Sequence, residues 1–173
     1  MEMELAQKLI NEGFDILDVA QSDFDVYYTI GRACYERYVD EYFGGWVDDV
    51  QLKMNTDAFK KEMGQSTFKK ILLNDEIIGF FAFDELEDKV NGVMIQMLEK
   101  AQGKGVGTCY LEHLTSIAKS KNIPIFLQVF KSNTAKNLYA RYGFATYDET
   151  TSHYLMRYTP PAGRRKRNAS STS

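Results

Sequence analysis

The 173-residue sequence has few of the residues that metal centres and disulfides require: two cysteines, Cys34 and Cys109, and two histidines, His113 and His153. Neither pair is spaced like the ligands of a metal site, so no metal is expected. Both cysteines fall in apolar stripes at helical spacing. We interpret them as small buried thiols rather than as a disulfide or a nucleophile.

Long apolar runs are also missing. No segment is long enough to span a bilayer, and the start of the chain, Met1 to Leu5, lacks the basic segment followed by an apolar one that marks a secretory signal. We therefore expect no membrane partner and a cytoplasmic location. With 44% hydrophobic and 26% charged residues the composition is globular, and the length predicts one domain over residues 1–159.

Acidic charge dominates the sequence outside its last residues. The formal net charge is −3, but Arg164, Arg165, Lys166 and Arg167 stand together in a Gly/Ser/Asn-rich tail, and without these four cations the remainder carries about −7. Residues 160–173 are interpreted as a disordered basic tail, with attachment to a nucleic acid or an anionic surface as the alternative. The acidic body favours cationic substrates and disfavours a nucleic-acid partner.

The periodicity of the apolar residues predicts an α/β domain with a mixed sheet. The almost unbroken apolar segments Val93–Leu98 and Ile125–Val129 indicate strands covered on both faces, and the first of these is expected at the centre of the sheet. The predicted order is a short helix within 1–12, a strand over 14–20, helices over 22–44 and 47–63, strands over 67–73, 77–83 and 93–98, a helix from 105, a strand over 125–129, a helix from 133, and strands over 145–147 and 153–158.

A glycine-rich segment, Gln102 to Thr108, opens the helix predicted from residue 105. Gly103, Gly105 and Gly107 carry no side chains that would keep an anion from the backbone, and the free N–H groups of a first helical turn favour a phosphate there. The spacing fits neither a P-loop nor the Gly-x-Gly-x-x-Gly dinucleotide motif, because Thr108 stands where the third glycine should be. A strand-to-helix turn without a ligand is the alternative for this segment taken alone.

A second segment, Asn133 to Phe144, predicts a short helix. Asn133 is suited to cap its start, and Gly143 to end it. A purely structural interpretation makes Tyr139 a core aromatic. The predicted buried stripe consists of Ala135, Leu138, Tyr139 and Tyr142.

Taken together, the two segments resemble the acyl-coenzyme A site of the GNAT superfamily of N-acetyltransferases. Gln102, Gly105 and Gly107 match the family pattern Gln/Arg-x-x-Gly-x-Gly/Ala, which lies after a strand and before a helix. Asn133 and Tyr139 match the family's second motif, and Asn133 follows Gly107 by 26 residues, with a helix and a buried strand between them. The resemblance covers roughly residues 65–158.

The resemblance implies a mostly antiparallel sheet of six to seven strands flanked by about four helices, with the fourth and fifth strands splayed apart. It implies an acyl-CoA-dependent N-acyltransferase of the EC 2.3.1 class. Such an enzyme transfers an acetyl group from acetyl-CoA, its co-substrate, to a primary amine of a small molecule, peptide or protein by direct attack in a ternary complex. A non-catalytic acyl-CoA-binding or sensing module is the alternative, and a homodimer is a further expectation.

Carried over by position, the resemblance also assigns roles. The backbone at Met97 and Leu98 would pair with the pantetheine arm, and Asn133 would hydrogen-bond that arm. Tyr139 would be the general acid that protonates the leaving thiolate, since an ordinary phenol pKa near 10 keeps it protonated. The pyrophosphate would bind to Gln102, Gly103, Lys104, Gly105, Val106, Gly107 and Thr108.

The base that deprotonates the acceptor amine is less evident. Family members often carry a Glu on the fourth strand, where this sequence offers only Gln96 among its polar side chains. Glu99, at the far end of that strand, is a candidate base. Glu41, Glu85 and a relay of water and backbone carbonyl are the alternatives.

The loop between the first two long helices usually walls the acceptor site in this family. Here it mixes aromatic and acidic residues over 40–49. Glu41, Tyr42 and Trp46 are expected to bind a cationic amine through ion-pair and cation–π contacts. The alternative is that the aromatics belong to the core and the acids to the solvated surface.

Overall fold

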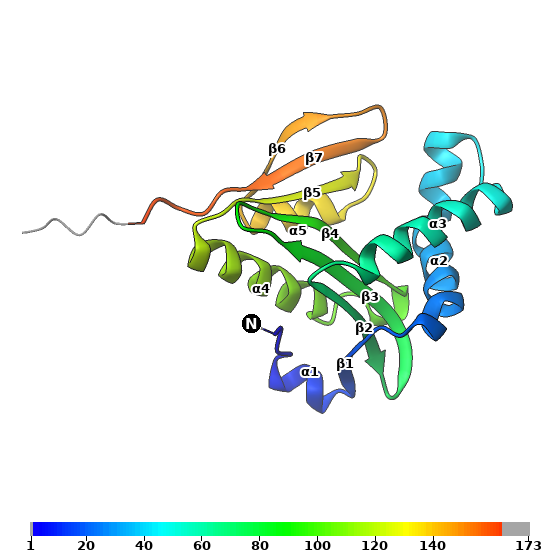
Figure 1. The fold of residues 1–173 in the computed structure, drawn as a ribbon, viewed down its shortest axis with the longest axis horizontal. Helices are drawn as coiled ribbons and strands as arrows, with labels where there is room; N and C mark the ends of the chain where they lie inside the picture. The colour runs from blue at the N-terminus through cyan, green and yellow to red at the C-terminus, as the bar shows by residue number, and fades with distance from the viewer. Residues whose placement is uncertain (1, 164–173) are drawn as a thin grey trace, which may run out of the picture.

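The protein is described by a computed structural model covering residues 2–163. Within these residues one seven-stranded sheet has the order β1-β2-β3-β4-β5-β7-β6 (Figure 1). All neighbouring strands are antiparallel except β4 and β5, which are parallel. The strands are β1 Phe14–Asp18, β2 Thr67–Leu73, β3 Glu76–Glu85, β4 Val90–Met97, β5 Ile125–Phe130, β6 Phe144–Glu149 and β7 His153–Tyr158.

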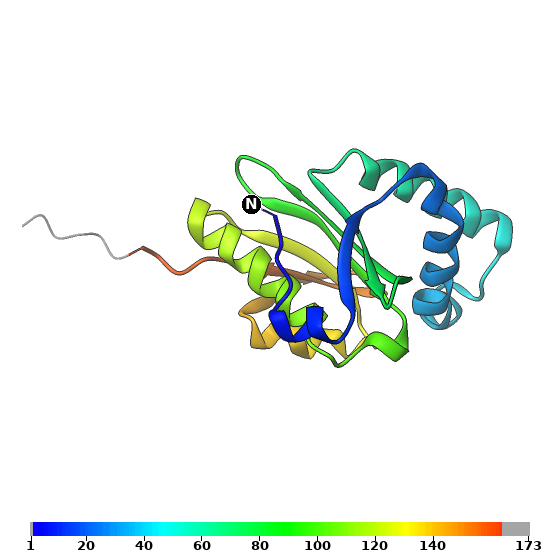
Figure 2. The same ribbon diagram turned by 90° about the horizontal axis from the view of Figure 1, so that it is seen from below.

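Helices cover both faces of the sheet (Figures 1 and 2). One core packs α1, α4 and α5 against one face, and a second, aromatic core packs α2 and α3 against the other. The helices are α1 Gln7–Asn11, α2 Phe24–Phe43, α3 Asp48–Met63, α4 Val106–Lys121 and α5 Ala135–Arg141, with 3-10 turns η1 Gln21–Asp23 and η2 Glu99–Ala101. The predicted fold class and order of elements are therefore confirmed.

The ends of the long helices follow local chemistry. The carboxylate of Asp23 accepts hydrogen bonds from the Ala20 N–H at 2.8 Å and from Lys70 Nζ at 2.9 Å, which fixes the turn before α2. α2 ends at Gly44, whose φ of 79° is the left-handed conformation that glycine adopts without strain. α3 carries acids in its first turn and lysines in its last, which complements the helix dipole.

Two expectations about burial are corrected by the structure. The α5 stripe of Ala135, Leu138 and Tyr139 is half-buried instead of buried, because α5 is short and covers only part of the first core. Cys34 and Cys109 are free, as expected, but they too are half-buried. The basic residues of the predicted tail, 164–167, lie outside the described residues. Among the described residues, no helix combines the length and the apolar character needed to cross a bilayer.

Candidate active site

The sheet opens between β4 and β5. The two strands pair at Val90 and Ile125, with the Val90 N–H donating to the Pro124 carbonyl at 2.9 Å, and then diverge (Figure 1). Further along β4, the carbonyls of Ile95 and Met97 accept side-chain hydrogen bonds and have no strand partner in β5. β4 therefore presents an internal strand edge, which an extended ligand can join as an added strand.

The backbone groups at the end of β4 form hydrogen bonds on both sides of the strand. The Leu98 N–H donates to the Ile78 carbonyl at 2.8 Å, so this donor belongs to the β3 side. The Met97 carbonyl accepts from Gln102 Nε2 at 2.8 Å and from Cys34 Sγ at 3.5 Å. The predicted pantetheine contact at Met97 and Leu98 stays a prediction, and the Leu98 N–H, which is bonded to β3, is not available for it.

The glycine loop presents a row of free donors. No acceptor within residues 2–163 pairs with the backbone N–H groups of 103–108, although the N–H of Cys109 bonds the Gly105 carbonyl at 3.0 Å. Gly103 and Gly105 have φ of 73° and 108°, and a Cβ added at either would stand in open space. A bent backbone with free N–H groups at the start of the 16-residue α4 is suited to an anion.

The side chains of this loop differ in what they can contribute. The Gln102 side chain donates a hydrogen bond to the Met97 carbonyl of β4, and Lys104 is an exposed residue of the loop. Val106 is fully buried, so its side chain anchors the helix and only its N–H can face a ligand. These positions agree with the predicted pyrophosphate cradle, which remains untested.

Asn133 and Tyr139 lie on the segment that follows β5, where Leu138 of α5 lies beside Gly107 of the glycine loop. Thr134 occupies the N-cap position of α5, one residue later than predicted. Asn133 Oδ1 still accepts from the N–H of the first helical residue, Ala135, at 2.9 Å, while its Nδ2 donates to no group within 2–163. Tyr139 is half-buried in contact with the first core, and its hydroxyl has no partner among the described residues. Burial raises the pKa of Tyr139 to about 12, so its proton is retained at neutral pH.

Tyr35 of α2 bridges the gap from the opposite face of the sheet. Its hydroxyl donates to the Ile95 carbonyl of β4 at 3.3 Å, and its ring lies 6.4 Å from that of Phe130 at the end of β5. The pKa of Tyr35 is raised, mainly by burial and to a smaller extent by the neighbouring Cys34 and Tyr139. Tyr35 and Tyr139 therefore lie within electrostatic range of each other across the opening.

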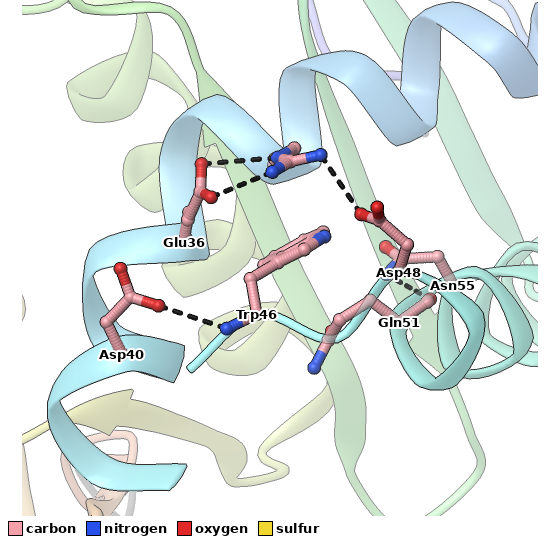
Figure 3. Close-up of polar contacts among 7 residues, drawn as sticks. Glu36, Asp40, Trp46, Asp48, Gln51 and Asn55 are labelled. Carbon is pink, nitrogen blue, oxygen red and sulfur yellow. Dashed lines mark hydrogen bonds and ion pairs between the residues drawn. The ribbon is translucent and has the colours of Figure 1, made fainter. Parts of the chain in front are cut away.

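Hydrogen bonds and ion pairs to charged side chains fix the loop between α2 and α3 (Figure 3). The Trp46 N–H of the backbone donates to Asp40 at 3.1 Å, and Arg32 bridges Glu36 and Asp48 at 2.9 and 3.1 Å. The Arg32 guanidinium lies 5.3 Å from the centre of the Trp46 ring. One cation–π contact of Trp46 is therefore made within the protein, and its buried Nε1 has no partner in the described part of the chain.

The other two predicted acceptor residues contact the end of β5. Glu41 accepts from the Ser132 hydroxyl at 2.7 Å, and the Tyr42 hydroxyl accepts from the Ser132 N–H at 3.0 Å. The rings of Tyr38 and Tyr42 stack on Phe130 at 4.8 and 5.8 Å, and His153 of β7 lies 4.0 Å from the same ring. Glu41 and Tyr42 thus join α2 to the β5–α5 turn, whereas the Trp46 ring packs against Tyr28 and Arg32 of α2.

The carboxyl groups considered as bases differ in their surroundings. Glu99 is exposed at the start of η2, and Glu85 forms an ion pair with Lys121. Gln96, at the strand position, is buried with its Nε2 donating to the Tyr27 carbonyl at 3.3 Å. One buried carboxyl, Glu62 of α3, was missed in the sequence because it follows Lys60 and Lys61 and resembles a solvated surface acid. Within residues 2–163, no group of three or more His, Cys, Asp or Glu could hold a metal ion.

Comparison with known proteins agrees with this geometry. The sequence profile of the acetyltransferase (GNAT) domain matches residues 37–160, which is well over half of the chain. The protein therefore belongs to the GNAT acetyltransferase family, and the resemblance seen in its motifs is confirmed.

Individual relatives extend the comparison. The [ribosomal protein bS18]-alanine N-acetyltransferase of Haemophilus influenzae is 33% identical over 86 residues, which cover 49% of this chain and 59% of that protein. The match thus spans less than two thirds of this relative's length. Among solved structures, the PaiA N-acetyltransferase of Thermoplasma acidophilum in complex with coenzyme A has a TM-score of 0.65 at 17% identity, covering 84% of this chain and 98% of that one. The ribosomal-protein-S18-alanine N-acetyltransferase of Escherichia coli has a TM-score of 0.60 at 20% identity, covering 88% and 97%. These two structures share the fold.

Proposed function

We propose that the protein transfers an acetyl group from acetyl-CoA to a primary amine by direct attack in a ternary complex. The observation that carries this proposal is the convergence of three features at one opening in the sheet. These are the unpaired N–H groups of 103–108, the free edge of β4, and the protonated phenol of Tyr139. The family to which the chain belongs supports the same chemistry.

Each feature has a task in that reaction. The loop N–H groups bind the pyrophosphate of coenzyme A, and the β4 edge aligns its pantetheine arm. The amine then attacks the thioester carbonyl, and Tyr139 donates its proton to the departing sulfur. Asn133 Nδ2 is a further donor for the arm.

We further propose that the acceptor is the amine of a peptide or protein. Support comes from the matched relative, whose name gives the alanine of a ribosomal protein as its substrate. The acidic first turn of α3 adds to it, because Asp49 is exposed there and has no ion-pair partner among the described residues. A ribosomal substrate would also agree with the cytoplasmic location, which stays a prediction, as does a homodimer.

A thiol-release assay tests the proposal. Purified protein is mixed with acetyl-CoA and with peptides that begin with different residues, alongside small polyamines and lysine derivatives. We expect release of coenzyme A only when an amine is present, and an acetylated product by mass spectrometry. Binding of acetyl-CoA without turnover on any amine would contradict the proposal and favour a binding module instead.

A further inference from the structure

Glu62 is a buried carboxyl group for which the packing supplies no sufficient partner. It lies in the last turn of α3 and is 9% exposed, and its Oε2 is buried without a hydrogen-bond partner among residues 2–163. Leaving a carboxylate oxygen unpaired in the interior costs stability, which a leucine or methionine at this position would not. A buried group of this kind therefore calls for an explanation beyond packing.

Its surroundings are aromatic and nearly uncharged. The hydroxyl of Tyr27 faces it from α2, and Lys61 is the charged neighbour on its own helix. Tyr35 of α2 and Tyr110 of α4 lie further off, within electrostatic range. Tyr27 packs edge-on against Phe59, Phe68 and Phe80 at 5.1 to 5.9 Å, which makes this side of the sheet a region of low polarity.

This environment changes the acidity of the group. Burial raises the pKa of Glu62 to about 7, while the hydroxyl of Tyr27 and the charge of Lys61 act in the opposite direction. A carboxyl with such a pKa is ionised in about half of the molecules at neutral pH, and its carboxylate is a stronger base than that of an ordinary glutamate. Both properties suit a general base.

The position of Glu62 relates it to the opening in the sheet. Glu62 lies on α3, which packs with α2 in the aromatic core on one face of the sheet. From the same face, Cys34 and Tyr35 of α2 hydrogen-bond the β4 carbonyls at the opening. Gln96 of β4 is bonded to the carbonyl of Tyr27, and an amide cannot take a proton. Glu62 lies beside the phenol of that same tyrosine.

We propose that Glu62 is the general base that takes the proton from the acceptor ammonium group. The inference rests on the proposed acetyl transfer. In the reaction the ammonium gives one proton to the carboxylate, and the freed lone pair forms the C–N bond to the thioester carbonyl. The C–S bond then breaks, the sulfur takes the proton of Tyr139, and the phenolate recovers a proton from the nitrogen of the adduct. Glu62 releases its proton to solvent, so one proton leaves per turnover.

The test measures kcat/KM from pH 5.5 to 9 with two acceptor amines of different pKa. The wild-type protein is compared with Glu62→Gln and with Glu87→Gln, a matched control in the exposed turn before β4. We expect an inflection near pH 7 that is the same for both amines. Glu62→Gln should lose this inflection and about 100-fold or more of kcat/KM, with unchanged affinity for acetyl-CoA, while Glu87→Gln retains both.

A second variant keeps the test decisive if Glu62→Gln does not fold. Tyr27→Phe removes the hydroxyl that lowers the pKa of Glu62, and it should move the inflection to higher pH. An inflection that Tyr27→Phe leaves in place, or that Glu62→Gln retains, overturns the assignment of Glu62 while acetyl transfer stands. Loss of the inflection in Glu99→Gln alone would transfer the role to Glu99. A wild-type protein that binds acetyl-CoA but acetylates no amine would overturn the proposed function and the base together.

Discussion

Relative to the wild-type protein, Glu62→Gln should gain stability as the pH rises from acidic to alkaline. In the folded protein burial raises the pKa of this carboxyl to about 7, against an ordinary value of 4.5 that the unfolded chain retains. Between these two values the folded state binds more protons than the unfolded state, so stability falls as the pH rises. Glutamine has nearly the same shape but never ionises, and it escapes this loss.

The magnitude follows from the difference in pKa. At about 1.4 kcal/mol per unit, the shift corresponds to roughly 3 kcal/mol once the pH exceeds 7. Gln also places an amide where the acid was, and that change contributes equally at every pH. The comparison is therefore made between two pH values, where the linkage relation gives about 2.5 kcal/mol of relative gain for Glu62→Gln from pH 5 to pH 8.

Urea unfolding at 25 °C and at both pH values measures this gain. Glu87→Gln serves as the control, because it removes an exposed carboxyl of the same kind. Burial lowers the pKa of His113 and of His153, but both titrate alike in wild type and variant and so cancel. A difference between wild type and Glu62→Gln that stays constant from pH 5 to pH 8 would refute the raised pKa and remove its support for a base.

Three further predictions concern the opening in the sheet and the strands beside it. Tyr139→Phe should lower kcat by about 100-fold or more and leave acetyl-CoA affinity unchanged by calorimetry, since only the proton donor is lost; an unchanged kcat would exclude Tyr139 as the acid. Gly105→Ala should cost roughly 1–2 kcal/mol in urea unfolding, because alanine is strained at φ 108°, and should weaken acetyl-CoA binding, since its Cβ would enter the open space at the loop; unaltered binding would argue against the cradle. Gly79→Ala should destabilise by roughly 3 kcal/mol, because its Cβ would stand 2.5 Å from the Gln96 carbonyl oxygen on the neighbouring strand; normal urea unfolding would contradict this close approach.

Much of the fold could be predicted because apolar periodicity is set by local geometry. The hairpin over Thr67–Leu73 and Glu76–Glu85 and the long helices ending at Gly44 and Gly64 each follow from alternation, helical spacing and a closing glycine. The exact start of β4 could not, because Val90 lies at the end of a charged segment without apolar alternation. Its place in the strand is set by pairing with Glu85 of β3 and Ile125 of β5.

The candidate site shows a different limit of the sequence. The apolar run of β4 predicts burial on both faces, yet Val93, Met94 and Ile95 are only half-buried in the structure. Apolar residues that line an opening for a ligand have the same pattern as residues covered by a helix. The glycine loop and Tyr139 could be predicted because they match motifs of particular residues at a fixed spacing. The periodicity of apolar residues alone does not identify such motifs.

Glu62 illustrates the remaining gap. Its neighbours Lys60 and Lys61 suggest a solvated helix end, whereas its helical position sets it one turn after Phe59, on the face that packs against the aromatic core. The spacing of one helical turn between Phe59 and Glu62 was therefore the feature of the sequence that indicated a buried Glu62. The unpaired Oε2 and the burial that raises the pKa of Glu62 both arise from the packing of α3 against another helix and the sheet, so only the folded structure could give them.

Burial acts on both proposed proton-transfer groups, with opposite consequences for their chemistry. It raises the pKa of Glu62 to about 7, which makes the carboxylate a stronger base, and raises that of Tyr139 to about 12, which keeps the phenol protonated. A phenolate formed at Tyr139 would therefore recapture a proton readily, and the proposed step takes it from the nitrogen of the adduct. It follows that the enzyme should contribute a single inflection, near pH 7, and that an additional enzyme-derived limb between pH 8 and 9 would contradict this division of roles.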